Sequence, residues 1–390
     1  MKHCMKSVLA ALMASAFIFM GCISISKTAY IYTVTVADTI EHGTITPSKS
    51  SEVGTYERIT LSIVPENGYE LDVLTITSDA DGKEVKVSDN EFRMPGASVT
   101  VTATFTKCAE TKAKPDAVGD VVLNDGRVVA YENINNMTDK QKAKAVAVIF
   151  YVGTECSNGG ETRTLGVGLH NALLASWCMS NASALDREIG AIRCKAEGTA
   201  GNYTFTGDRN GSDNLSQIVA YLKQLTNVPD DTGLSAKSSF YNDQNYPAFY
   251  FAKNYKDLKY QLPGDNTAKP FSRESIFGDG GNWRTPNLGK SYSDGWYLPT
   301  IAELFQVWKV KDKIDAVSAL CNGSNFSKEA YVSSSVLDNT AGVAYLQFSS
   351  GECGATEKYK TGFAANSKNA INKWTGVRNS CFLTQAFLCA

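Results

Sequence analysis

The cysteines and histidines are the residues of this sequence that could carry nucleophilic chemistry. A thiol needs a neighbouring base or positive charge to lower its pKa before it attacks a substrate. Cys381 and Cys389 lie eight residues apart near the C-terminus, with no histidine close to them in the sequence. A Ser-His-Asp or Cys-His device in the C-terminal part would have to use His170. One histidine beside an apolar strand is usually structural, so we expect no catalytic residues.

Carboxylates offer a second kind of chemistry, metal binding. Asp208, Asn210 and Asp213 alternate acidic and amide oxygens, but their spacing lacks the glycine and terminal glutamate of a twelve-residue calcium loop. Asp230 and Asp231 lie in a Pro-Asp-Asp-Thr-Gly sequence, which is typical of a turn. No stretch has the glycine, lysine and hydroxyl spacing of a phosphate-binding loop. The sequence therefore predicts neither a metal site nor a cofactor.

The charges are nearly balanced, with 38 basic and 40 acidic residues. Nucleic-acid binding needs a concentrated basic surface to neutralise phosphates, and the sequence contains no such cluster. Nucleic acid is therefore not an expected partner. With 390 residues and 43% hydrophobic content, the chain is too long for one ordinary core, and we expect two or more domains.

The N-terminus has the order of a secretory signal. Lys2 and Lys6 precede an uncharged run of 14 residues from Ser7 to Met20, which is shorter than the roughly 18 residues of a membrane-spanning helix. The run ends in Phe19-Met20-Gly21-Cys22, which resembles a lipobox, although Phe19 stands where leucine is usual. We expect residues 1–21 to be removed and Cys22 to be acylated. The alternative is a cleaved signal with an incidental cysteine.

This interpretation places the protein outside the cytoplasm. Acyl chains on Cys22 would anchor it to a bacterial membrane without a spanning segment. We expect an outer-membrane or cell-surface location. An even number of cysteines in an exported chain favours disulfides, although their pairing stays open and buried free thiols are the alternative. Apart from Cys4 and Cys22, these cysteines are Cys108, Cys156, Cys178, Cys194, Cys321, Cys353, Cys381 and Cys389.

Residues 30–107 alternate with the two-residue period of half-buried strands. Turn sequences such as Asn67-Gly68, Asp81-Gly82 and Pro95-Gly96 separate the alternating stretches, so we expect a small all-β domain. The alternating residues are Tyr32, Val34, Val36, Ile59, Leu61, Ile63, Leu74, Ile76, Val85, Val87, Val99, Val101, Ala103 and Phe105.

The amino-acid sequence of this segment resembles the divergent internalin-type bacterial repeat. The resemblance is carried by Tyr32–Val36, Gly43–Ile45, Pro65–Tyr69, Phe92–Pro95 and Val99–Phe105. Such repeats serve as spacers or stalks on bacterial surface proteins, and the sequence contains one copy. The resemblance implies a presenting module, with direct ligand binding as the alternative.

A second, mixed α+β domain is expected over residues 119–390. Residues 108–118 lose the alternation and gain Lys, Ala and Pro, which indicates a linker. Asn124-Asp125-Gly126 between two valine-rich stretches predicts a hairpin. Leu215 to Leu225 has helical spacing behind Ser212 and Asp213, two residues that could cap a helix.

The clearest local signal is the capping box at Thr300 and Glu303. Thr300 can accept from the first turn while Glu303 reaches back to the amide of Thr300, and Pro299 prevents extension of the helix backward. Ile301, Leu304, Phe305 and Trp308 would line one face. A second helix is expected around Ile314 to Leu320, followed by strands at Tyr331–Leu337 and Gly342–Ser349.

Four motifs in this order resemble the formylglycine-generating-enzyme type of C-type lectin domain. These are Gly295–Thr300 with Glu303-Leu304, Tyr331–Ser335, Phe348–Gly351 and Val377-Arg378. The domain occurs in bacterial surface lipoproteins, including treponemal variable proteins diversified by retroelements. Val332 stands where an aromatic is common, and the ending after Arg378 is longer than the usual closing strand.

The resemblance implies a rigid frame that presents binding loops. Its displayed surface, carried over by position, would contain Tyr345, Gln347, Glu352, Tyr359, Asn366, Asn369, Asn372 and Trp374. Polar residues around a few aromatic anchors suit adaptable contacts with a protein or glycan ligand, although each residue could also be a solvated loop position. We therefore expect a binding protein of the adhesin kind. The alternatives are an antigenic decoy without a fixed ligand and a formylglycine-generating-type oxidase.

Overall fold

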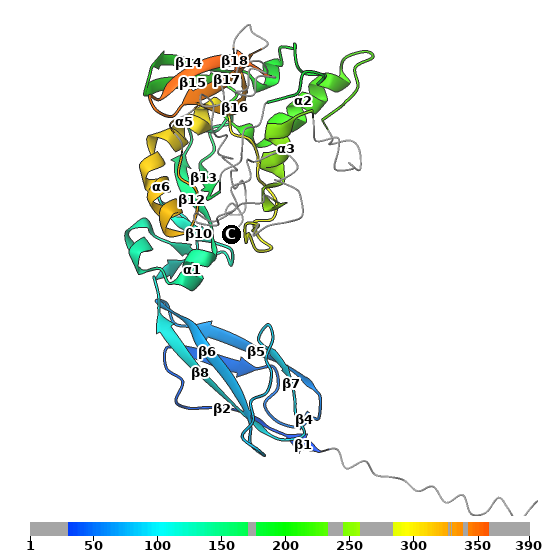
Figure 1. Ribbon diagram of the computed structural model, residues 1–390, viewed down its shortest axis with the longest axis vertical. Helices are drawn as coiled ribbons and strands as arrows, with labels where there is room; N and C mark the ends of the chain where they lie inside the picture. Colours follow the sequence, from blue (N-terminus) through cyan, green and yellow to red (C-terminus); the bar gives the residue numbers. More distant parts are fainter. Residues whose placement is uncertain are drawn as a thin grey trace, which may run out of the picture. The chain divides into compact units, whose positions relative to one another are not determined.

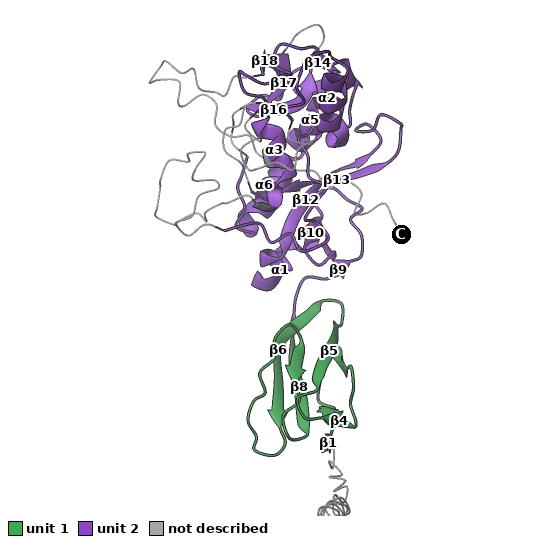
Figure 2. Ribbon diagram, turned by 90° about the vertical axis from the view of Figure 1, so that its right-hand side faces the viewer, with its two compact units in different colours: residues 1–106 green, residues 107–390 purple. Residues whose placement is uncertain are grey.

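The computed structural model describes residues 30–170, 177–232, 245–257, 284–326, 328, 330–337 and 342–358. It divides into two compact units, residues 1–106 and residues 107–390, which Figure 2 colours separately. Unit 1 is built of strands, whereas unit 2 combines strands with helices (Figure 1). The chain is therefore an α+β protein with an N-terminal β unit.

Unit 1 contains three small sheets around one core. Their strand orders are β2-β8-β6, β3-β5-β7 and β1-β4. Along β5 the buried Ile59 and Leu61 alternate with exposed Arg58 and Thr60, which confirms the predicted two-residue period. The strands are β1 (Ile31–Tyr32), β2 (Val34–Val36), β3 (Gly43–Pro47), β4 (Val53–Gly54), β5 (Arg58–Pro65), β6 (Tyr69–Ser78), β7 (Glu91–Arg93) and β8 (Val99–Lys107).

One predicted strand of unit 1 does not form. Val85 and Val87 lie between two isolated bridges, Thr77 with Glu84 and Ser88 with Glu91. Both valines pack partly buried against the core, so they keep the apolar contact that the alternation predicted without a continuous ladder. In this segment the two valine side chains are buried in part, although the backbone does not form a continuous strand pairing.

The parallel pairing of β2 with β8 sets where the chain enters and leaves unit 1. Val34 lies opposite Val99 and Val36 opposite Val101. From Val99 the strand β8 continues eight residues in the same direction to Lys107, which is about 26 Å at the usual rise. Tyr30 precedes β2. The two ends of unit 1 therefore lie far apart along its strands.

Unit 2 contains a five-stranded sheet, a hairpin and a three-stranded sheet. The five-stranded sheet has the order β13-β12-β10-β11-β9, the hairpin is β14-β15, and the last sheet is β16-β17-β18. The strands are β9 (Thr111–Lys112), β10 (Val121–Leu123), β11 (Val128–Val129), β12 (Ala145–Gly153), β13 (Arg163–Gly168), β14 (Cys194–Thr199), β15 (Asn202–Gly207), β16 (Ala330–Val336), β17 (Gly342–Gln347) and β18 (Glu352–Glu357).

Unit 2 also contains α-helices and 3-10 helices. The α-helices are α1 (Asp139–Ala143), α2 (Asn214–Lys223), α3 (Pro247–Lys253), α5 (Ile301–Lys309) and α6 (Lys311–Leu320). The 3-10 helices are η1 (Tyr131–Asn136), η2 (Gly190–Ile192), η3 (Gly211–Asp213) and η5 (Tyr255–Asp257). No helix among the described residues is both long and apolar enough to cross a membrane.

The segment 108–118, predicted as a linker, belongs to the fold of unit 2. Thr111–Lys112 forms β9 and pairs with β11 at the edge of the five-stranded sheet. Ala109 is buried, and its amide and carbonyl bond the side chain of Gln141 at 3.0 and 2.9 Å. The two residues of β9 are too few to show an alternation, which explains why composition alone indicated a linker.

Two other local predictions are confirmed, and a third is partly wrong. The hairpin forms between β10 and β11, with Gly126 at φ 90° in its turn. Thr300 caps helix α5, and both bonds of the capping box are present. Helix α2 also forms, but Asp213 makes no capping bond, and Asn210 instead accepts from the amide of Ser212 to cap η3.

Candidate functional site

Three of the predicted ligand-contact residues lie on one face of the sheet β16-β17-β18. Tyr345 and Gln347 are two residues apart on β17, and Glu352 is the partner of Gln347 on β18. Side chains two apart on a strand share a face, and paired residues point the same way. The three residues therefore form a contiguous surface, called the sheet face below.

The remaining predicted residues are not placed. Tyr359, Asn366, Asn369, Asn372 and Trp374 lie outside the described residues, as do Cys22, Cys381 and Cys389. The ligand surface expected from the resemblance is therefore described only at its β17–β18 end.

Tyr345 is held over a glycine of the neighbouring strand. It pairs with Gly354, and a Cβ on Gly354 would lie 2.4 Å from the Tyr345 Cζ. The ring therefore occupies the space that any other residue at position 354 would fill. Tyr345 is half-buried, so it presents part of its ring from a fixed position.

Gln347 and Glu352 differ in how far their side-chain polar atoms are available to bind a ligand. The Gln347 amide nitrogen Nε2 donates to the carbonyl of Lys328 at 2.7 Å and to the Ser349 hydroxyl at 2.9 Å. Gln347 therefore fastens the β17 end to the preceding chain. Glu352 is exposed beside it, so its carboxylate reaches solvent. Of the three, Tyr345 and Glu352 are the better contact residues.

The opposite face of the sheet is an aromatic core. The rings of Tyr331 and Phe348 are 4.2 Å apart between centroids, and Phe326 lies 4.8 Å from Phe348. Tyr331 and Phe348 are buried. Such clustered rings contribute through both buried area and ring geometry, and they make this sheet a stiff support.

The serine triplet of β16 joins this sheet to the start of α5. Ser335 accepts from the amide of Ile301 at 3.0 Å, one of the first-turn amides that a helix cannot satisfy internally. Ser334 donates from its amide to the Pro299 carbonyl at 2.6 Å, and Ser333 donates to the Ala344 carbonyl at 2.9 Å. All three serines are buried. The sequence marked the triplet as a family motif but not this role.

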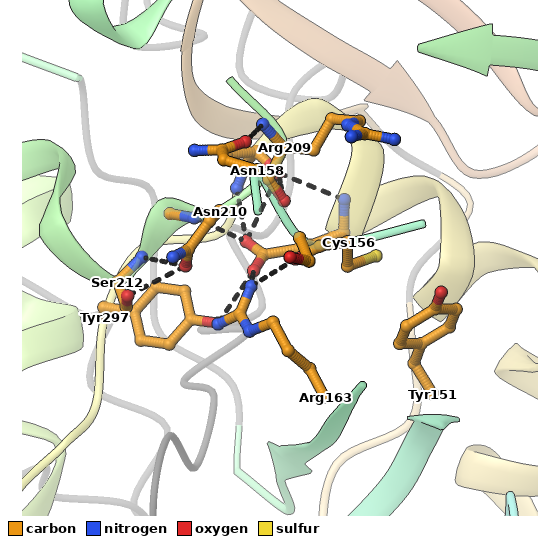
Figure 3. Close-up of polar contacts among 12 residues, drawn as sticks. Tyr151, Cys156, Asn158, Arg163, Arg209, Asn210, Ser212 and Tyr297 are labelled. Atoms are coloured by element: carbon orange, nitrogen blue, oxygen red, sulfur yellow. Dashed lines mark hydrogen bonds and ion pairs between the residues drawn. The ribbon is translucent and has the colours of Figure 1, made fainter. Parts of the chain in front are cut away.

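A buried ion pair fixes the start of α5 from its other side. Arg163 of β13 donates from Nη1 to Glu303 Oε1 at 2.8 Å and from Nη2 to the Tyr297 hydroxyl at 2.9 Å. Tyr297 in turn donates to Glu303 Oε1 at 2.8 Å. Figure 3 shows the Arg163 guanidinium and the Tyr297 hydroxyl directed at one another. Burial raises the pKa of Glu303, and the guanidinium opposes that rise.

The second oxygen of Glu303 is also fully used. Glu303 Oε2 accepts from the amides of Thr300 at 2.9 Å and Gly211 at 3.2 Å. A Cβ on Gly211 would lie 2.8 Å from the Leu298 carbonyl oxygen, so the close approach needs glycine. Glu303 is therefore a junction between β13, η3 and α5. Sequence reasoning identified Glu303 as a cap residue and missed Arg163, because its partner is 140 residues away.

Asp208 is a second buried carboxylate in this region. Its Oδ1 accepts from the Asn158 amide at 2.8 Å and from the backbone of Asn210 at 3.3 Å. The described residues supply no donor to Asp208 Oδ2 or to Asn214 Oδ1, both of which are buried. Burial raises the pKa of the Asp208 carboxyl. An uncharged side chain is therefore favoured at position 208.

Asn210 and Asp213, two of the three residues with alternating oxygens, use side-chain oxygens in local hydrogen bonds. Asn210 Oδ1 accepts from the amide and hydroxyl of Ser212, and Asp213 accepts from the Gln217 amide at 2.9 Å. Within the described ranges, no three His, Cys, Asp or Glu residues come together as metal ligands.

No disulfide joins the described cysteines to one another, contrary to the expected pairing. Cys108, Cys156, Cys178, Cys194 and Cys321 are buried, and Cys353 is half-buried. Burial raises the pKa of Cys178, Cys321 and Cys353 to about 12 and also raises the pKa of Cys156 and Cys194. Thiols in such surroundings stay protonated and unreactive at neutral pH, so an even cysteine count did not imply pairing here.

His170 is likewise enclosed by the fold. It is buried at the end of β13, and its amide donates to the Tyr255 hydroxyl at 2.9 Å. The ring is shielded from bulk solvent, which suits a packing residue better than a base that must meet a substrate.

Lys358 fixes the end of β18, where the predicted ligand loops begin. Its ammonium donates to the carbonyls of Ala184 at 2.9 Å and Arg187 at 2.6 Å, and lies 4.9 Å from the centre of the Trp177 ring. Burial lowers the pKa of Lys358 to about 8. Sequence reasoning missed this residue, since a lysine in a polar stretch gives no sign of burial.

The comparisons with known proteins identify unit 1. Residues 32–109 match the family model described as the divergent InlB B-repeat domain. This match confirms the internalin-type repeat expected over residues 30–107, a kind of domain that occurs in bacterial surface proteins. No curated protein and no solved structure matches the chain.

Proposed function

We propose that this chain is an exported bacterial lipoprotein in which unit 1 presents a ligand-binding unit 2. Acylation at Cys22 holds the N-terminus in a membrane, the repeat spaces unit 2 from it, and unit 2 binds a protein or glycan through a C-type-lectin-like surface. It is a binding protein and not an enzyme.

The spacer role is supported by the way the chain passes through unit 1. The parallel pairing of β2 and β8 puts the entry before β2 and the exit at Lys107 far apart along the strands. A domain whose ends met would add little distance between its neighbours. The match to a repeat of surface proteins agrees with this role.

The observation that carries the binding role is the sheet face. Tyr345, Gln347 and Glu352 were selected from the resemblance alone, and they lie together on one face of β17 and β18. A half-buried tyrosine next to an exposed carboxylate combines a rigid aromatic contact with a polar one. The aromatic core, the serine triplet and the Arg163–Glu303 pair support the sheet face, and none of their residues belongs to it.

The protonation state of the described cysteines favours a binding role over that of a thiol oxidase. An oxidase of the formylglycine-generating type needs reactive thiols, whereas burial raises the pKa of the five for which a shift is resolved. Cys381 and Cys389 lie outside the described residues, so replacing both with serine tests the oxidase directly. Ligand binding that is unchanged in this double variant agrees with the proposal.

The experiment is a binding screen with matched variants. The chain carrying Cys22→Ser is applied to a printed glycan array and to purified extracellular-matrix proteins. Tyr345→Ser, Glu352→Lys and Trp374→Ala should each weaken a hit by about tenfold, as expected for contact residues. Glu132→Lys makes the same charge change on exposed η1 and should have no effect. A hit that tolerates all three variants contradicts this site.

The anchor is tested separately. Metabolic labelling with a fatty-acid analogue should mark the natural chain, and mass spectrometry should find Cys22 as the acylated first residue. Cys22→Ala should abolish both signals. A processed chain that starts elsewhere and carries no lipid contradicts the anchor and leaves the ligand-binding role of unit 2 standing.

A further inference from the structure

Three apolar side chains lie exposed at one end of unit 1. Tyr30, Ile31 and Tyr56 expose 71%, 62% and 73% of their surface. Ile31 of β1 pairs with Gly54 of β4, which brings Tyr30 and the turn Gly54–Glu57 to the same end of the two strands. Both views place β1 and β4 together at that end (Figures 1 and 2). These three residues are called the N-terminal patch.

Tyr56 holds a backbone conformation that disfavours tyrosine. Its φ of 65° lies in the left-handed region, which costs a residue other than glycine about 1–2 kcal/mol. The turn is fastened by bonds from the Glu57 amide to the Gly54 carbonyl at 3.1 Å and from the Tyr56 amide to the Met94 carbonyl at 2.8 Å. Glycine would fit without strain. An exposed ring kept at this cost points to a use for the ring.

The position of the patch in the chain indicates what it contacts. Tyr30 follows Cys22 by eight residues, which span at most about 29 Å when fully extended. With the acyl chains of Cys22 in a bilayer, the patch lies within this distance of the lipid headgroups. Tyrosine combines an apolar ring with a hydroxyl and is enriched at that interface.

The charges around the patch are compatible with this contact. Lys49 pairs with Glu57 at 3.0 Å and Arg58 with Glu91 at 3.0 Å, so neither carboxylate stands alone beside the turn. Arg93 donates to the Tyr56 carbonyl at 3.4 Å, and no carboxylate within the described ranges pairs with it. A positive charge next to Tyr56 is attracted to anionic headgroups.

We propose that the N-terminal patch inserts into the interfacial layer of the membrane that carries the Cys22 anchor. The inference rests on the lipid anchor of the proposed function and adds a protein surface to it. Unit 1 is then seated on the bilayer by Tyr30, Ile31 and Tyr56, with β8 leading away from it.

The first experiment measures vesicle binding by the N-terminal patch in a chain that carries no acyl group on residue 22. The mature chain, which begins at residue 22 and carries Cys22→Ser, is mixed with vesicles of phosphatidylethanolamine containing a minor share of phosphatidylglycerol, and bound protein is sedimented. The triple variant Tyr30→Ser, Ile31→Ser, Tyr56→Gly should bind about tenfold more weakly. The control Val64→Ser, Val73→Ser removes apolar side chains that are 58% and 51% exposed elsewhere in unit 1 and should bind unchanged. Equal binding by the triple variant and its parent overturns the patch.

A second measurement uses the acylated chain. On the same vesicles, hydrogen exchange of the amides of Gly54–Glu57 should be slower than in solution, and the triple variant should lose that protection while it stays bound through its acyl chains. Exchange that is as fast on vesicles as in solution also overturns the patch. Absence of lipid on Cys22 instead overturns the anchor, and the sedimentation result then decides the patch by itself. Thermal unfolding of the triple variant reports whether unit 1 remains folded.

Discussion

Arg163 and Glu303 are 140 residues apart in the chain, and their side chains meet at 2.8 Å in the interior of unit 2. The pair connects β13 to the first turn of α5, and the serine triplet connects the same turn to β16. Two strands from separate sheets thus converge on one helix start. This junction aligns the sheet face with the rest of unit 2.

Replacement of Arg163 by methionine should strongly destabilise unit 2. It leaves Glu303 buried without its cation, a change that typically costs about 3–5 kcal/mol. Lys195→Met is the matched control, because Lys195 pairs with Glu197 on the surface at 2.7 Å and such pairs contribute about 1 kcal/mol or less. Urea unfolding followed by tryptophan fluorescence reports on unit 2, which contains all five tryptophans. A similar loss of unfolding free energy in the two variants would show that the buried ion pair contributes no more to stability than the surface pair.

Asp208→Asn should stabilise the protein at neutral pH. Burial raises the folded-state pKa of Asp208, so the folded state binds its proton more tightly than the unfolded state does. The stability linked to this proton is complete below the ordinary pKa of 3.8 and is lost as the pH rises through the folded pKa. Asparagine carries no charge and keeps an oxygen for Asn158. Melting temperatures measured from pH 4 to pH 8 should show a gain that grows with pH, and a gain independent of pH would contradict this.

Gly354→Ala should displace Tyr345 and lower stability by about 1–3 kcal/mol, since the added Cβ would overlap the ring. Adding Tyr345→Ala should recover most of this loss, because the overlap disappears. Differential scanning calorimetry of the two single variants and the double variant measures the coupling. Additive losses would mean that the ring does not depend on the glycine.

The described thiols should resist alkylation in the native protein. All five of Cys108, Cys156, Cys178, Cys194 and Cys321 are buried, and burial raises the pKa of the last four, so we expect these thiols to react with iodoacetamide only after unfolding. Peptide mass spectrometry before and after denaturation identifies each site. Rapid native labelling at Cys178 would contradict the enclosed environment beside Lys358.

The sequence predicted the parts of the fold that local chemistry determines. The capping box at Thr300 and Glu303, the Asn-Asp-Gly hairpin and the alternation of unit 1 depend on residues within one element, and all three are present. The sheet face was selected from family motifs, and the register of β17 with β18 brings its three residues together.

The parts that were missed depend on partners far away in the chain. Arg163 and Lys358 look like surface residues in the sequence, and the burial of Asp208 is equally unmarked there, because charge predicts exposure unless a buried partner is known. The segment 108–118 was predicted as a linker because a two-residue strand has no measurable period. Disulfides were predicted from an even count, whereas no disulfide joins the described cysteines to one another.

The β2–β8 pairing also determines how unit 1 responds to force. A pull between an anchored N-terminus and a ligand held by unit 2 draws β2 backward and β8 forward. The bonds from Val99 to Thr33 and from Ala37 to Val101, both 3.0 Å, lie across the strands and are loaded together in shear. They must break at once instead of opening one after another. Under the proposed function, unit 1 would carry tension between the anchor and the ligand, and its rupture rate, not its equilibrium stability, would set how long the attachment lasts.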